Sequence, residues 1–101
     1  MRQAYQDLLK LKDIWEDRVG HFVRYKRGGG KPPYVATIEE VIMPGHFPSE
    51  VRPTFRNYDP RDTLSVVIST PSEVYVWIKT SEVKYLGEDY GLAAASILKK
   101  K

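Results

Sequence analysis

The spacing of apolar residues changes at Gly20, from the period of a helix to that of a strand. After Gly20, apolar and polar residues alternate, which is the period of a half-buried strand. Before it, apolar residues recur every three or four positions, as on one face of an amphipathic helix; they are Ala4, Leu8, Leu11, Trp15 and Val19. We therefore expect a helix over residues 1–19, its apolar stripe packed on a β-rich core or, alternatively, held by a partner.

The segment that follows the helix has the pattern of a β-hairpin. Two alternating stretches flank a Gly-rich turn, the arrangement that joins neighbouring antiparallel strands. The residues expected on the shared inner face are His21, Val23, Tyr25, Tyr34, Ala36 and Ile38. The adjacent Glu39 and Glu40 interrupt the pattern and predict a bulge or a strand end.

The second half of the chain predicts more strands and a closing helix. Residues 64–69 and 73–79 have strand patterns, and in the latter Val74, Val76 and Ile78 alternate with Tyr75 and Trp77. A short helix follows over 89–98, with acids before it and lysines after it, as its dipole favours. The expected fold is α+β: one domain, 1–101, with a small, strongly bent antiparallel sheet or barrel of 4–5 strands and a helix at each end.

The sequence VWIKTSEVKYL (residues 76–86) resembles the end of a Src-homology-3-type small barrel. In such barrels the penultimate strand commonly leads through a one-turn helix into a short closing strand. The resemblance covers residues 20–86 and concerns the fold alone; the long loop and both flanking helices depart from the minimal barrel. Because barrels of this type host many functions, the resemblance implies a fold and no particular activity.

Residues 43–62 form the longest stretch without a sustained period, and they include four prolines. We expect a long irregular loop, which in a small domain is either functional or mobile. Aromatic and arginine side chains dominate protein interfaces, and with one histidine they make this the candidate protein-interaction set: His46, Phe47, Arg52, Phe55, Arg56 and Tyr58. Alternatively, the aromatic rings fold back over an open end of the barrel.

Positive charge concentrates in the hairpin. Residues 21–34 hold four cations and no acid, whereas the whole chain carries only +3. An aromatic ring beside cations suits base stacking and phosphate neutralisation, so we predict a nucleic-acid contact through Phe22, Arg24, Lys26, Arg27 and Lys31. The alternative is an ordinary solvated strand.

The string RGGGK at the hairpin tip is similar to a phosphate-binding loop but lacks its essential context. A Walker loop continues with Ser or Thr and opens a helix, whereas here Lys31 is followed by Pro32 and Pro33, which lead into a strand. Two interpretations remain: a flexible hairpin tip, or an anion cradle formed by backbone amides and the lysine.

Catalytic chemistry has little support in the sequence. There is no Cys, His21 and His46 are the only histidines, and neither has a metal-type partner at helical spacing. Glu39 and Glu40 are neighbours on a strand, so they point to opposite faces and do not form an acid–base pair. We expect no enzyme activity, no cofactor and no metal.

The longest run of Val, Ile and Leu is residues 66–68, and the first residues lack the apolar core of a signal peptide. We therefore expect a cytoplasmic protein with no membrane contact. The predicted function is a small non-enzymatic module that binds nucleic acid through the basic hairpin, helped by the lysines of residues 99–101. The alternative is a protein-interaction module, a small regulator or assembly subunit, that uses residues 43–62 or the helix stripe. Its size also suits an accessory protein of a virus or mobile element.

Overall fold

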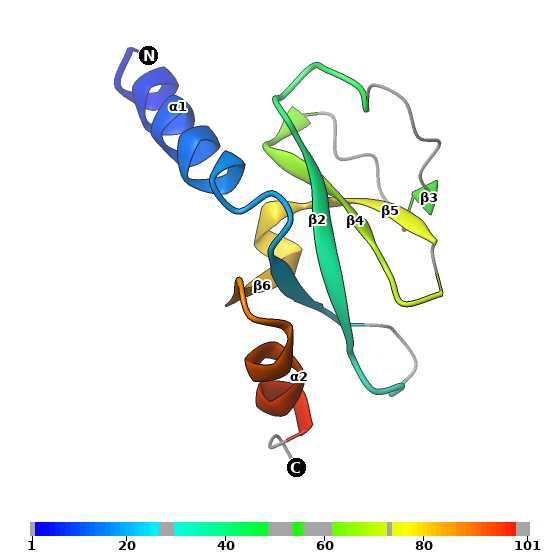
Figure 1. Cartoon of the computed structure of the whole chain (residues 1–101). Coiled ribbons are helices and arrows are strands. Elements are labelled where there is room, and N and C mark those ends of the chain that lie inside the picture. The colour runs from blue at the N-terminus through cyan, green and yellow to red at the C-terminus, as the bar shows by residue number, and fades with distance from the viewer. Residues whose placement is uncertain (1, 27–29, 49–53, 56–61, 73, 99–101) are drawn as a thin grey trace.

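One sheet and two helices make up the computed structural model, which describes residues 2–26, 30–48, 54–55, 62–72 and 74–98 (Figure 1). The elements in chain order are α1 (Arg2–Glu16), β1 (Phe22–Tyr25), β2 (Tyr34–Ile42), β3 (Thr54–Phe55), β4 (Ser65–Ser69), β5 (Tyr75–Lys79), the 3₁₀ turn η2 (Thr80–Glu82), β6 (Val83–Gly87) and α2 (Tyr90–Leu98). The predicted α+β class, with a helix at each end of a small antiparallel sheet, is confirmed.

The strands lie in the order β3-β5-β4-β2-β1-β6. Five of them are antiparallel neighbours, and β6 returns from the end of the chain to pair with β1. The expected irregular loop of residues 43–62 needs one correction. It contains the short strand β3, which pairs in parallel with β5, placing Thr54 beside Val76 and Phe55 beside Trp77 in the backbone register.

The hairpin and its bulge follow the sequence prediction. Strand β1 pairs with β2 so that Val23 lies opposite Ala36, and both are buried. The register of β2 against β4 shifts between Ile38 and Glu40, so Glu39 is the extra residue of a bulge. The bulge shifts by one residue the positions of β2 that face the core. Val41, three residues after Ile38, therefore packs against the same cluster as Ile38.

Helix α1 is shorter than the stripe predicted. It ends at Glu16, and a turn over residues 17–20 leads into β1. Gly20 has φ +90°, a conformation that glycine adopts at little cost, and its amide donates to the Ile38 carbonyl of β2 at 2.8 Å. Val19 therefore lies outside the helix, and its side chain is exposed rather than packed.

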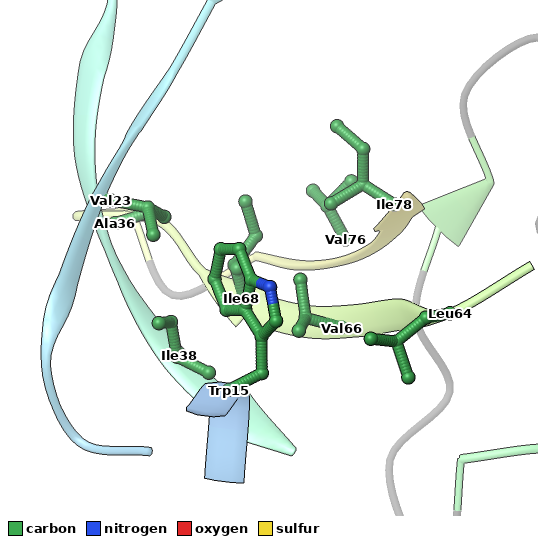
Figure 2. Packing of buried hydrophobic residues seen from close by; sticks show 9 residues of the cluster. All are labelled: Trp15, Val23, Ala36, Ile38, Leu64, Val66, Ile68, Val76 and Ile78. Carbon is green, nitrogen blue, oxygen red and sulfur yellow. The ribbon is translucent and has the colours of Figure 1, made fainter. Parts of the chain in front are cut away.

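The main core forms where α1 meets one face of the sheet. Figure 2 shows the Trp15 indole among Ile38, Val66 and Ile68, side chains from two central strands. Trp15 is only 7% exposed, so the prediction that it packs on the sheet is confirmed. Burying so large a ring removes much apolar surface from water, which anchors the C-terminal end of α1 to the sheet.

A second cluster of Ile42, Val67 and Trp77 covers the opposite face of the sheet. The sequence predicted an alternation in β5, with Trp77 on the face opposite to Val76 and Ile78. The ring does point to that side, but it is also buried, because β5 is covered on both faces. Val74, which was predicted to share a face with Val76 and Ile78, precedes β5 and is exposed. The predicted alternation is therefore present over residues 76–78, with both faces buried, and does not extend to Val74.

Helix α2 packs against β6, β1 and β2. Its start is capped by Asp89, whose Oδ1 accepts a 3.0 Å hydrogen bond from the Leu92 amide. Ala93 is fully buried, which lets the helix backbone approach the strands closely. Neither helix, over the stretches that the structure describes, is long and apolar enough to cross a membrane.

Candidate functional site

The β1–β2 hairpin places its cations through the same alternation that buries its apolar residues. Val23 points into the core, so its neighbour Arg24 points to the outer face of the sheet. Across the strands, Arg24 lies opposite Val35 of β2 and Lys84 of β6. Lys84 thus puts a further exposed cation beside Arg24, a neighbour that the sequence analysis did not identify.

A pocket of about 190 Å³ gathers three of the predicted nucleic-acid-binding residues. Its lining consists of Arg24, Lys26, Lys31, Pro33 and Ile97. Three of these five described lining residues are cations, and none of the five is acidic. Converging like charges in a concave site attract anions, and the electrostatic potential is focused there. Arg27, the remaining cation of the predicted set, lies outside the described residues.

Ile97 enters the pocket from α2, and it is 64 residues from Pro33, the nearest of the other lining residues in sequence. The helical pattern of residues 89–98 predicted the element, but no local signal predicted its place over β1 and β2. Capping by Asp89 and burial of Ala93 fix that place. The result is a wall that is apolar at Ile97 and Pro33 and cationic elsewhere, a lining able to hold an anion attached to an apolar or aromatic group.

Phe22, the aromatic member of the predicted set, has a partner of its own. Its ring lies 5.3 Å from the Tyr90 ring at an interplanar angle of 72°, an edge-to-face pair. Phe22 is half-buried, and Tyr90 of α2 is exposed. Phe22 is thus engaged by α2 and does not line the pocket with Arg24.

The described members of the predicted protein-interaction set lie away from the basic pocket. His46 and Phe47 are exposed, and the Phe47 ring lies 5.9 Å from the Trp77 ring of β5. For Phe55 the structure describes the backbone, in β3. Arg52, Arg56 and Tyr58 lie outside the described residues. Strand β4 lies between β5 and the basic β1–β2 hairpin, so the Phe47 ring beside β5 is separate from the cations of the hairpin.

A polar cluster at the end of α1 was not anticipated from the sequence. The guanidinium of Arg18 lies 4.8 Å from the Trp15 ring centroid and 4.1 Å from that of Tyr85, between two aromatic faces. The Tyr85 hydroxyl lies 2.8 Å from Nδ1 of His21, whose Nε2 is 3.6 Å from a Glu88 carboxylate oxygen. These contacts join the turn after α1 to β6, so the role of the cluster is to position this turn against the sheet.

Among the described residues, no three metal-ligating side chains form a group that could hold an ion. Comparison of the chain with protein-family models, with curated proteins and with solved structures gives no match.

Proposed function

We propose that this protein is a small, non-enzymatic binding module that contacts the phosphates of nucleic acid through its basic pocket. The observation that carries the proposal is the convergence of Arg24, Lys26 and Lys31 on one concave site. Lysine and arginine side chains bind nucleic acid by neutralising phosphates and releasing condensed counterions. Lys84, beside Arg24 on the neighbouring strand, extends the cationic surface beyond the pocket.

The strand arrangement supports a Src-homology-3-type barrel as the scaffold. Strand β6 follows β5 through the single turn η2 and pairs with β1, so the last strand returns to the first. The remaining strands follow as β1, β2, β4 and β5 in antiparallel order. In this scaffold Lys26 directly follows β1 and Lys31 precedes β2, at the hairpin end of the two strands, and Arg24 lies on β1 next to the buried Val23.

Fluorescence anisotropy with short labelled single- and double-stranded DNA and RNA tests the proposal. We expect a dissociation constant below about 0.1 mM at about 50 mM salt, since ordinary non-specific binding is at least that tight at physiological salt. Lys26→Glu should weaken this binding. Lys12→Glu makes the same charge change on α1, away from the pocket, and should leave it unchanged. No binding by the wild type at that salt would overturn the proposal.

A second candidate function is protein interaction, favoured by the exposed aromatic ring of Phe47. It is 59% exposed although it contacts Trp77. Such a ring can bury further area against a partner at little entropic cost. Affinity purification with and without nuclease separates the two functions, because protein partners of the Phe47 surface would survive nuclease and be lost with Phe47→Ala. Nuclease-sensitive partners would instead support the basic pocket.

A further inference from the structure

Helix α1 is held to the domain at one end only. Trp15 is buried in the core and Leu8 packs against its edge, while the N-terminal turns extend away from the sheet (Figure 1). Large apolar side chains remain exposed along the helix, and they are Tyr5, Leu9, Leu11 and Ile14. A helix of fifteen residues is marginal in water without an apolar face to bury, so a surface that covers these side chains would stabilise it.

Leu11 and Ile14 form the centre of this exposed surface. They are three residues apart, so their side chains are neighbours on the helix, and they are 44% and 46% exposed. They lie to one side of the line through Leu8 and Trp15 that faces the sheet. A second helix can therefore pack on Leu11 and Ile14 while Trp15 stays in its own core.

The charges beside this apolar pair complement a second copy of the same helix. Lys10 and Asp17 are seven residues apart, two helical turns, so they lie on the same flank of the Leu11–Ile14 pair. Both are exposed, and the Asp17 amide still donates to the Asp13 carbonyl at 3.2 Å, which continues the helical turn. In an antiparallel pair of α1 helices, Leu11 of each copy meets Ile14 of the other, and each Lys10 meets the opposite Asp17.

We propose that α1 is a self-association surface and that two copies of this chain pair through antiparallel α1 helices. A two-fold interface must be complementary to itself. The order Lys10, Leu11, Ile14, Asp17 meets this condition, because the positive end of the flank in each copy lies beside the negative end of the flank in the other. The seam is a single helical face, smaller than the roughly 1,200 Å² of a standard stable interface. The dimer is accordingly weak and forms with rising concentration.

Sedimentation equilibrium without nucleic acid tests this proposal independently of the proposed function. Lys10→Glu and Asp17→Lys should each raise the dimer dissociation constant by about 3- to 10-fold, since each creates two like-charge contacts. The double variant exchanges the charges and should return to within about 2-fold of the wild type. Asp13→Lys makes the same change as Asp17→Lys off the seam and should have no effect.

A separate substitution tests the apolar contact between Leu11 and Ile14. Ile14→Ser should abolish the dimer, whereas Leu9→Ser, on another face of α1, should leave it; circular dichroism melts of both variants establish that they fold. The proposal is overturned if the wild type stays monomeric up to about 1 mM, because even a dimer with a millimolar dissociation constant would form at that concentration. The exposed face of α1 would then be left for a different partner. A dimer that survives Ile14→Ser, or a charge exchange that fails to restore it, would also overturn the proposal.

Discussion

The indole Nε1 of Trp77 donates a 2.7 Å hydrogen bond to Oγ of Ser65, and both side chains are buried. The Ser65 hydroxyl lies 3.5 Å from the Ile42 carbonyl, so one serine links three strands on the second face of the sheet. Trp77 is the largest fully buried side chain. Its polar N–H group is tolerated inside the protein because Oγ of Ser65 accepts its hydrogen bond.

Ser65→Ala should therefore destabilise the protein out of proportion to the one atom removed. It leaves the Trp77 N–H buried without this acceptor, which costs about 1–3 kcal/mol of unfolding free energy. Chemical denaturation measures the change. Ser69→Ala is the matched control, because its hydroxyl donates to Glu39 at the exposed surface and its loss should cost about 0.5 kcal/mol. Equal losses in the two variants would show that the buried bond has no special weight.

Trp15→Ala should remove the anchor of α1. Truncating a buried tryptophan costs about 3–5 kcal/mol, a large part of the 5–15 kcal/mol that stabilises a typical domain. Thermal melts followed by circular dichroism measure the loss. Leu9→Ala, at an exposed position of the same helix, should shift stability by less than about 1 kcal/mol. If Trp15→Ala melts with the wild type, α1 is not docked on the sheet.

The edge-to-face pair of Phe22 and Tyr90 should couple α2 to the sheet. A double-mutant cycle with Phe22→Leu and Tyr90→Leu isolates the interaction, and we expect a coupling of about 0.5–1.5 kcal/mol. The cycle is measured by denaturant unfolding of the wild type, both single variants and the double variant. A coupling indistinguishable from zero would mean that Tyr90 does not hold the Phe22 ring.

The basic pocket should make nucleic-acid affinity depend on salt. With three phosphates neutralised, by Arg24, Lys26 and Lys31, the slope of log affinity against log salt on duplex DNA is about −2.7, since each contributes about −0.9. Lys26→Ala should make the slope shallower by about 0.9, and Lys12→Ala should not change it. Anisotropy titrations at several salt concentrations give the slopes. The same slope for both variants would place the phosphates outside the pocket.

Most of the helices and strands were predicted from local periodicity in the sequence. The change of period at Gly20, the bulge at Glu39 and the one-turn helix before β6 are all present in the structure. Each depends on residues within a few positions of one another, because side-chain direction in helices and strands repeats over short distances. The same reasoning placed Arg24 on the outer face of β1, opposite the buried Val23.

What the sequence by itself determined is therefore the type and order of the elements and the face to which each hairpin side chain points. Only the tertiary structure decided which faces are covered: it left Leu11 exposed, buried Trp77 on the second face of the sheet, and brought Ile97 to Lys31. The physical reason is the distance along the chain over which each effect acts. Backbone geometry sets the period within a segment, whereas burial depends on contacts between segments far apart in the chain, as where Trp15 meets Ile68.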